Sequence, residues 1–293
     1  MKVLSVVIPS YNYDCSRLVQ QLLQQLPQDA EIIVGDDCST DAETVRRLAA
    51  IASLPHCRLY RPDHNLGRAS IRNVLAREAS GKWLMFVDAD AEVRSDDFIS
   101  TYLSAAREAD VVCGGTGNLP SCPDQAMRLC YDYVSEAERR LTLSHRRQHP
   151  YDGFTTFNFL ILRSLFLAIC FDEGIKEYGH EDTLFGLELK QRGIKVHHID
   201  NKLTHLGLEV AEVFLAKTET ALRTLSSMEL CQQQNVRVSA LALRLQRQHL
   251  LGFVRLVFKL LRTPLRANLL GKHPSQKAFA FYKLGYFAQC MHA

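Results

Sequence analysis

The chain has 293 residues, of which 47% are hydrophobic and 23% are charged, and this balance excludes disordered and fibrous proteins. Its length suits one large α/β domain with an appendage. The net charge of +3 is unevenly divided, because residues 231–293 hold ten lysines or arginines and no aspartate or glutamate, which leaves −7 on the rest. Nine cysteines without a C-x-x-C pair, and an N-terminal apolar run too short for a secretory signal, predict a cytoplasmic protein.

Strand and helix patterns alternate along the first ninety residues. Short apolar runs predict strands at residues 3–8, 31–35, 57–60 and 83–87. Helical spacing of apolar residues predicts helices after Ser16, after Thr40 and after Gly67. Pro9 should end the first strand, and Thr40 with Glu43 forms a capping-box pattern for the second helix. The alternation predicts an α/β fold with a doubly wound, mostly parallel sheet and helices on both faces.

Two of the predicted strands end in paired carboxylates. Asp36 and Asp37 follow the second strand, and Asp88 and Asp90 follow the fourth. The carboxyl ends of parallel strands share one edge of the sheet, which is where open α/β sheets bind ligands. Carboxylates there commonly hold Mg²⁺ or Mn²⁺ on the phosphates of a nucleotide. For Asp88 and Asp90 alone, a solvated acidic turn is an equally good interpretation.

Two arginines on the third helix could meet the same phosphates. Arg68 and Arg72 are four residues apart, so they share one helical face. For Arg68, a place on a solvated helix face is the better interpretation.

Four segments taken together resemble a known family. They are residues 5–12, 34–41, 65–73 and 88–90, and both their order and their spacing match. They resemble the family 2 glycosyltransferases of bacterial polysaccharide and lipopolysaccharide synthesis, over roughly residues 1–205. The resemblance implies the glycosyltransferase A fold, hexosyltransferase-type activity, a nucleotide-sugar donor and Mn²⁺ or Mg²⁺ as cofactor.

The same resemblance implies roles for individual residues around the nucleotide. Pro9, Tyr11 and Asp37 would line the nucleoside pocket, with Asp37 accepting the uracil N–H, and Asp36 would support that loop. The other implied nucleotide-binding residues are Asn12, Asn65, Gly67, Arg72 and Asp88.

A metal site is implied beside the nucleotide. Asp90 would hold the cation on the diphosphate, while Asp88 would face the ribose or a metal-bound water. Several enzymes of this fold complete the site with a late histidine, and His205 is the candidate because imidazole is a reasonable ligand for Mn²⁺. A core position between leucines is the alternative for His205.

A catalytic base is expected further along the chain, because the acceptor hydroxyl must lose its proton as it attacks. Glu181 and Asp182 are the first residues of a predicted helix. Carboxylates at this position also have a purely structural explanation, because they complement the helix dipole. The resemblance instead implies that Asp182 is the base, and that Glu181 either contacts the acceptor or supports a residue that does. Asn158 is a candidate acceptor contact, with core packing as the alternative.

Two other segments are expected to be structural. Residues 114–118 are rich in glycine but do not follow the first strand, which favours a turn after a strand at 111–113 over a dinucleotide loop. His197 and His198 have no partner at ligand spacing and are expected on the surface of a strand.

The basic region after residue 230 predicts a surface helix. Its arginines and lysine at helical spacing would share one face until Pro264 interrupts the helix; they are Arg244, Arg247, Arg255, Lys259, Arg262 and Arg266. No stretch here reaches the roughly 20 apolar residues of a membrane span. A basic amphipathic helix at 240–270 predicts contact with an anionic membrane surface. The alternative is a helix packed on the catalytic domain, and no nucleic-acid partner is expected.

These inferences divide the chain at residue 207. Residues 1–207 are predicted to be the catalytic domain, with a nucleotide-binding half at 1–115 and an acceptor-binding half at 116–207, and residues 208–293 a helical extension. The predicted enzyme is metal-dependent and, by the resemblance, inverting. It would move a sugar from a nucleotide-sugar, UDP preferred, to a hydroxyl of a lipid-linked or growing glycan.

The predicted location is peripheral, at the inner face of the plasma membrane. Two alternatives stay open: a sugar-nucleotide-forming nucleotidyltransferase and a catalytically degenerate binding protein of the same fold. The first should carry a glycine-rich phosphate loop where residues 9–12 stand.

Overall fold

The computed structural model describes residues 2–152, 154–175 and 178–291. The chain forms two compact units. The sheet unit comprises Met1–Leu119, Glu138–Lys176 and Glu181–Gly207, and the helical unit comprises Pro120–Ala137, Glu177–His180 and Leu208–Ala293.

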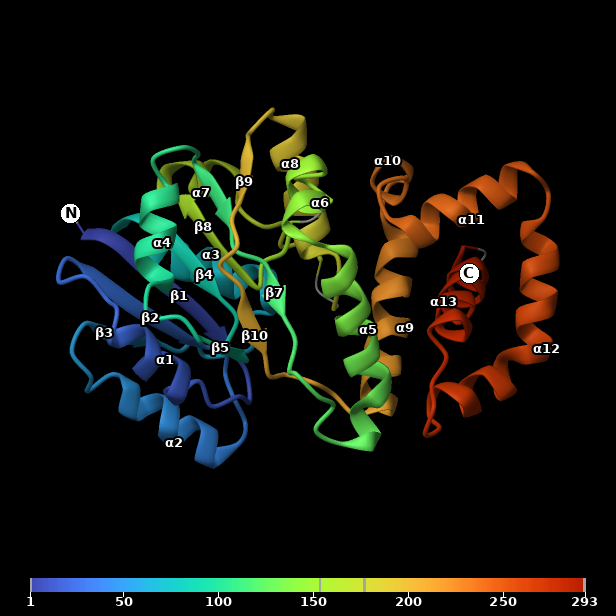
Figure 1. The fold of residues 1–293 in the computed structure, drawn as a ribbon, viewed down its shortest axis with the longest axis horizontal. Coiled ribbons are helices and arrows are strands. Elements are labelled where there is room, and N and C mark those ends of the chain that lie inside the picture. Colours follow the sequence, from blue (N-terminus) through green and yellow to red (C-terminus); the bar gives the residue numbers. More distant parts are fainter. Residues whose placement is uncertain (1, 153, 176–177, 292–293) are drawn as a thin grey trace. The chain divides into compact units, whose positions relative to one another are not determined.

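A seven-stranded sheet forms the centre of the sheet unit (Figure 1). Its strands are β1 (Lys2–Ser10), β2 (Ala30–Asp36), β3 (Cys57–Tyr60), β4 (Gly81–Val87), β6 (Val111–Cys113), β8 (Asn158–Leu162) and β9 (Val196–His198). Their order is β3-β2-β1-β4-β8-β6-β9, and β8 runs antiparallel to both of its neighbours whereas the other pairs are parallel. The prediction of a mostly parallel sheet is confirmed.

A second, smaller sheet joins segments that are far apart in sequence. It consists of β5 (Ala91–Glu92), β10 (Leu203–His205) and β7 (Thr116–Gly117), in the order β5-β10-β7. Because β10 pairs with β5 through His205 and Ala91, it brings the end of the sheet unit beside the segment that follows β4.

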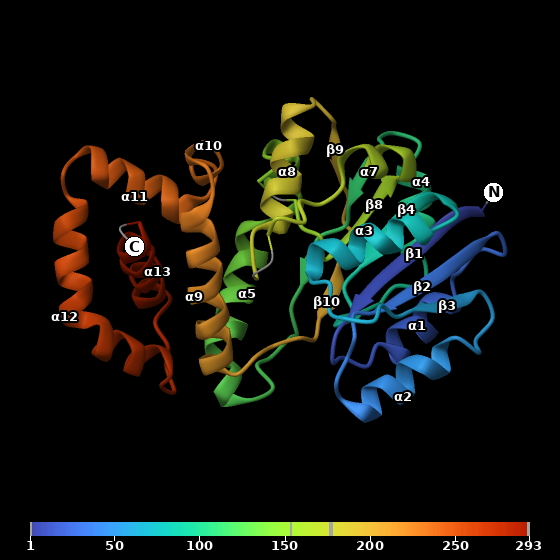
Figure 2. The ribbon, with the colours of Figure 1, turned by 180° about the vertical axis from the view of Figure 1, so that it is seen from behind.

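Helices cover both faces of the large sheet. They are α1 (Ser16–Leu23), α2 (Ala42–Ile51), α3 (Arg68–Glu78), α4 (Phe98–Ala105), α6 (Leu143–Gln148), α7 (Arg163–Ile169) and α8 (Glu181–Gln191). Alternate residues of β1 enter opposite cores: Val6 and Ile8 pack with α1, α2 and α4, whereas Val7 packs with α3, α7 and α8. Figure 2 shows α3 and α7 on the face opposite α1 and α4. Burial on both faces explains why these strands are apolar throughout.

Two predicted element boundaries are wrong. Pro9 lies inside β1, which continues to Ser10, because the pairing of β1 with β4 ends at Val7 and a residue without an N–H is tolerated beyond that point. The cap of α2 is Asp41, whose carboxylate accepts the Thr44 N–H at 2.8 Å, so Thr40 does not form the predicted capping box.

The helical unit is built mainly from the C-terminal part of the chain. Its helices are a short 3-10 turn η1 (Gln125–Met127), α5 (Arg128–Arg140), α9 (Ala211–Ser227), α10 (Leu230–Gln233), α11 (Arg237–Arg247), α12 (Leu251–Leu269) and α13 (Gln276–Cys290). Helix α13 lies between α9 and α12 (Figures 1 and 2). A Cβ at Gly285 of α13 would collide with the Phe258 ring of α12, so the glycine allows the close approach of these helices.

The basic region does not form the single helix predicted at 240–270. His249 adopts a left-handed backbone conformation, with φ of 58°, between α11 and α12. Arg244 and Arg247 therefore lie on a different helix from the later basic residues. Pro264 does not end α12, which continues through it to Leu269. No helix in the described ranges is long and apolar enough to cross a membrane.

Candidate functional site

The predicted site residues of the first half gather at one edge of the large sheet. β1, β2 and β4 run parallel, so the residues that follow them emerge on the same side. These residues are Tyr11 and Asn12 after β1, Asp37 after β2, and Asp88 after β4. Tyr11 is half exposed there, which leaves an aromatic surface for a planar ligand.

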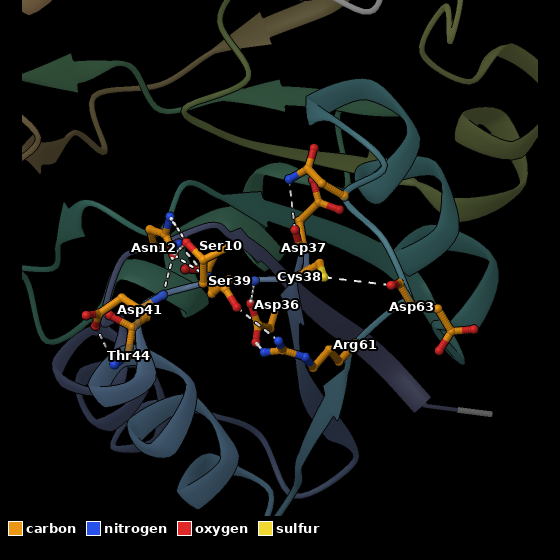
Figure 3. Close-up of polar contacts among 12 residues, drawn as sticks. Ser10, Asn12, Asp36, Asp37, Cys38, Ser39, Asp41, Thr44, Arg61 and Asp63 are labelled. Atoms are coloured by element: carbon orange, nitrogen blue, oxygen red, sulfur yellow. Dashed lines mark hydrogen bonds and ion pairs between the residues drawn. The ribbon is translucent and has the colours of Figure 1, made fainter.

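Asn12 ties the loop after β1 to the loop after β2 (Figure 3). Its Oδ1 accepts the backbone N–H groups of Thr40 and Asp41 at 2.8 and 3.1 Å, and its own N–H donates to Ser39 Oγ at 2.8 Å. Its φ of 50° is in the left-handed region, which asparagine adopts more easily than most residues. Asn12 thus fixes the loop geometry beside the exposed Tyr11.

Asp36 is buried and supports the same loop from below. Its Oδ1 accepts the Ser39 N–H at 2.8 Å, and its Oδ2 forms an ion pair with Arg61. Arg61 also donates to the Ser39 carbonyl at 2.9 Å. Arg61 was not identified from the sequence, because it lies outside the four motifs, just after β3.

Asp37 joins the loop after β2 to the beginning of α3. Its two carboxylate oxygens accept the backbone N–H groups of Leu66 and Gly67 at 2.7 and 2.9 Å. Asn65 Nδ2 donates to the backbone carbonyl of Asp37 at 2.8 Å. Gly67 has φ of 84°, a conformation that favours glycine. Asn65 and Gly67 therefore lie next to Asp37 and shape the same edge.

Two arginines of α3 converge on Asp88. Arg72 is buried, and its Nη2 donates to Asp88 Oδ1 at 2.5 Å. Arg68 is 48% exposed and lies with Nη2 3.6 Å from Asp88 Oδ2. The same Arg68 donates from Nε to Glu181 Oε1 at 2.8 Å. Arg68 is exposed, as the solvated-face interpretation predicts, but it also bridges two carboxylates that are 93 residues apart in the sequence.

Asp90 faces His205 across the small sheet. Asp90 Oδ2 lies 3.2 Å from His205 Nε2, and the Asp90 carbonyl accepts the Leu206 N–H at 2.8 Å. A Cβ at position 207 would collide with the Asp90 carboxylate, so Gly207 leaves the room that this side chain occupies. Burial acts to raise the pKa of Asp90, but His205 and then Arg68 outweigh it and hold the pKa below its usual range.

Glu181 and Asp182 begin α8, and their pKa values are shifted in opposite directions. Burial favours the neutral form of Glu181, but the charges of Arg68 and Arg72 outweigh it and lower the pKa of Glu181. Burial first, and the Glu181 charge second, raise the pKa of Asp182 to about 6. Asp182 Oδ1 accepts the Thr183 N–H at 2.7 Å. A carboxylate with such a pKa is suited to accept a proton near neutral pH.

Asn158 lies in the core of the sheet unit. It is fully buried, its Nδ2 donates to the Gly115 carbonyl at 2.6 Å, and its Oδ1 accepts the Tyr102 hydroxyl. Because both ends of its amide are bonded inside the protein, these surroundings favour core packing over an acceptor contact.

The sequence predicted that His198 lies on the surface of a strand, but His198 is almost fully buried. Its Nδ1 lies 3.1 Å from Arg146 Nη1, and burial lowers its pKa to about 4, so it is neutral at physiological pH. Arg146 also donates to the carbonyls of Gly114 and Ile199 at 3.2 and 3.0 Å. The backbone of Gly115, with φ of 93°, passes directly beside its guanidinium. This buried arginine was not identified from the sequence.

A divalent cation would fit beside Asp90 better than beside Asp88. The two oxygens of Asp88 already face arginines, whereas Asp90 Oδ2, from the turn between β4 and β5, lies beside His205 Nε2 of β10. Within residues 2–152, 154–175 and 178–291, no three His, Cys, Asp or Glu side chains form a potential metal site. The protein would supply two ligands, and Mg²⁺ is commonly held by one or two side chains plus substrate phosphates and water.

Comparison with known proteins supports the family suggested by the motifs. The family described as glycosyl transferase family 2 matches residues 5–168. An uncharacterized glycosyltransferase of Haemophilus influenzae is 38% identical over 90 residues, which are 30% of this chain and 29% of that protein.

Two solved structures share the fold over nearly the whole chain. TarS 1–349 of S. aureus in complex with UDP-GlcNAc has a TM-score of 0.54 at 18% identity, covering 100% of this chain and 91% of that one. The mannosyltransferase PcManGT of Pyrobaculum calidifontis, in complex with GDP-Man and Mn²⁺, has a TM-score of 0.59 at 14% identity and covers 99% and 85%. At these identities, the matches establish the glycosyltransferase A fold.

Proposed function

Because the chain belongs to glycosyl transferase family 2, we propose that it transfers a sugar from a nucleotide-sugar to a hydroxyl group, as a hexosyltransferase-type enzyme. The donor proposed is a UDP-sugar, the cofactor Mn²⁺ or Mg²⁺, and the stereochemical course inverting. The observation that carries the proposal is the grouping of Asp88, Glu181 and Arg68 in one ion-pair chain beside the Asp90–His205 pair.

The nucleoside is proposed to bind at the ends of β1 and β2. Tyr11 is half exposed and Pro9 partly exposed, so the two together offer an apolar surface to a base. The Asp37 carboxylate accepts two backbone N–H groups, and its remaining lone pairs leave it able to accept a base N–H as well. The complex of TarS with UDP-GlcNAc supports a uridine donor, while that of PcManGT with GDP-Man makes guanosine the main competitor.

The diphosphate is proposed to lie between Asp90 and Arg68. A cation held by Asp90 and His205 would offset the negative charge that develops on the leaving diphosphate. Arg68 offers a second positive charge, and it is the more exposed of the two arginines near Asp88, so a phosphate can reach it. Arg72 is buried against Asp88, and we propose that it positions this carboxylate rather than contacting phosphate.

Asp182 is proposed to be the base that deprotonates the acceptor. In an inverting reaction the acceptor oxygen attacks the anomeric carbon, the bond to the diphosphate breaks, and the hydroxyl proton passes to a carboxylate. Glu181 stays ionised because Arg68 pairs with it, and its charge helps to keep the pKa of Asp182 near the working pH. Glu181 thus acts as an acceptor contact or as a positioning residue for the base.

The acceptor is proposed to be a lipid-linked or growing glycan, and the enzyme to work as a peripheral protein at the inner face of the plasma membrane. The ten basic residues and no acidic residue in 231–293 support contact with an anionic surface. The nucleotidyltransferase alternative gains no support, because Asn12 ties the loop after β1 to its neighbour and no glycine-rich phosphate loop occupies residues 9–12.

A thermal-shift series tests the proposal. The protein is heated with UDP, GDP, CDP or ADP, each with and without Mn²⁺. A metal-dependent rise of the melting temperature with UDP alone supports the donor and metal assignments, and UDP-sugars are then screened for transfer, with the product anomer read by NMR. A rise with GDP or CDP overturns the uridine assignment, and no rise with any nucleotide supports the binding-protein alternative.

A further inference from the structure

Helix α12 carries apolar side chains on two opposite faces. One face packs into the helical unit, where Phe258 and Leu269 are fully buried. The other face is exposed to solvent and is called the α12 ridge. It consists of Phe253, Leu256 and Leu260, which are 67%, 56% and 71% exposed. Their spacing of three and four residues places them on one stripe of the helix. A contiguous stripe of large apolar groups in solvent marks an interaction surface.

A basic row runs along α12 beside this ridge. It consists of Arg255, Lys259, Arg262 and Arg266, spaced four, three and four residues apart. Arg255 Nε donates to the Ala288 carbonyl at 2.7 Å, and the Arg262 guanidinium lies 5.7 Å from the centre of the Tyr286 ring. These contacts to α13 hold one side of the row against the protein, so α12 presents its ridge in a fixed orientation. Lys259 and Arg266 are exposed.

We infer that the α12 ridge inserts into the interfacial region of an anionic lipid bilayer, with Lys259 and Arg266 at the level of the headgroups. The helix has 19 residues, about 28 Å at 1.5 Å per residue, and it would lie in the membrane plane. Interfacial helices combine two contributions: apolar groups that enter the acyl boundary, and cationic groups that reach anionic phosphates. The sequence predicted a basic amphipathic helix on an anionic membrane surface; the fold adds which apolar side chains of α12 remain exposed.

Charge complementarity favours lipid over a second copy of the chain. Two copies packed ridge to ridge would bring two basic rows together, and residues 231–293 contain no carboxylate side chain to pair with them. An anionic bilayer would supply negative charge to Lys259 and Arg266, the two members of the row placed at the headgroups. Lipid binding by α12 does not depend on sugar transfer, so this inference stands or falls separately from the proposed reaction.

Flotation of the full chain with vesicles tests the inference. The vesicles are phosphatidylcholine alone or a mixture of phosphatidylcholine and phosphatidylglycerol. The wild-type protein should float with the mixed vesicles, and the double variant Leu256→Ser/Leu260→Ser should bind them at least about tenfold more weakly because ridge burial is lost. The double variant Lys259→Gln/Arg266→Gln should lose the preference for the anionic mixture.

A matched control replaces two exposed leucines elsewhere in the helical unit. Leu230 and Leu241 are 63% and 45% exposed on α10 and α11, and Leu230→Ser/Leu241→Ser should bind vesicles like the wild type. All variants should keep the wild-type melting temperature and nucleotide shift, because these side chains are exposed. Equal binding by the ridge variant and the wild type, or no binding of the wild type to either vesicle, would overturn the inference.

Two further measurements distinguish insertion from other contacts. In Phe253→Trp, the new indole should be quenched by brominated lipids, whereas the single native Trp83 is buried in the sheet unit and gives the background in the wild type. Sedimentation velocity reports a second copy: a dimer that the ridge variant abolishes, together with no lipid quenching, would assign the ridge to self-association and refute lipid insertion.

Discussion

The edge of the large sheet and residues 231–293 of the helical unit differ in how their charged side chains are arranged. At the edge of the large sheet, arginines and carboxylates pair with one another: Arg72 with Asp88, Arg68 with Glu181 and Asp88, and Arg61 with Asp36. In the helical unit, the residues from 231 onward carry ten positive charges and no negative one. A cluster of both signs is suited to stabilise charge that develops in a reaction, whereas charge of one sign is suited to attract a surface of the opposite sign.

The largest expected effect belongs to the base. Asp182→Asn should lower kcat by about 10³-fold, because the amide cannot accept the acceptor proton. Glu188→Gln on the same helix is the control, since Glu188 pairs with Arg192 at the surface and its loss should leave kcat unchanged. Steady-state transfer assays compare the two. Near-normal turnover of Asp182→Asn would rule out the assignment of the base.

Loss of a proposed metal ligand should give the next largest effect. His205→Ala should weaken Mn²⁺ binding by about tenfold or more, since one of the two proposed protein ligands is lost. The matched control is His197→Ala: each histidine side chain is 21% exposed, and each Nε2 faces a carboxylate, Asp90 for His205 and Glu108 for His197. Titration calorimetry of Mn²⁺ in the presence of UDP measures both. Equal affinities in the two variants would show that His205 is not a ligand.

Removal of the exposed arginine at the sheet edge should have a moderate effect. Arg68→Met should weaken binding of UDP by about tenfold while uridine binding stays unchanged, because a charge-assisted contact to phosphate is lost. Arg77→Met is the control on the same helix, where Arg77 is 52% exposed and lies 3.7 Å from Glu173. An equal loss for uridine and UDP would point to a loosened fold rather than a phosphate contact.

The smallest effect concerns pH. Transfer should rise with pH through about 6 as Asp182 loses its proton. Glu181→Gln should move this rise to lower pH, because the negative charge that raises the pKa of Asp182 is removed. The pH profile of kcat/KM checks both statements. If the rise occurs at the same pH in Glu181→Gln as in the wild type, it does not report deprotonation of Asp182. Asp182 has a higher pKa in the folded protein than in the unfolded chain, so the folded state binds its proton more tightly. Its contribution to the free energy of unfolding therefore falls as pH rises from about 4 to about 6.

Most of the sheet unit could be predicted from the sequence because its signals are local. Apolar runs and the residues that end them gave the first strands to within a few residues, and the paired aspartates fell at strand ends. The misplaced cap of α2 has a tertiary cause, since Thr40 donates its N–H to Asn12 from the neighbouring loop. Contacts of this kind join residues far apart in the sequence, so no local sequence pattern predicts them.

The sequence by itself determined the alternation of strands and helices, the family motifs and the division of charge near residue 230. Only the tertiary structure decided that Arg68 reaches Glu181, 113 residues away, that His198 is buried against Arg146, and that α11 and α12 are separate helices. It also decided which apolar face of α12 is buried. Periodicity records that a helix has apolar faces, but whether a face packs inside the protein or stays exposed depends on which other segments the fold brings against it.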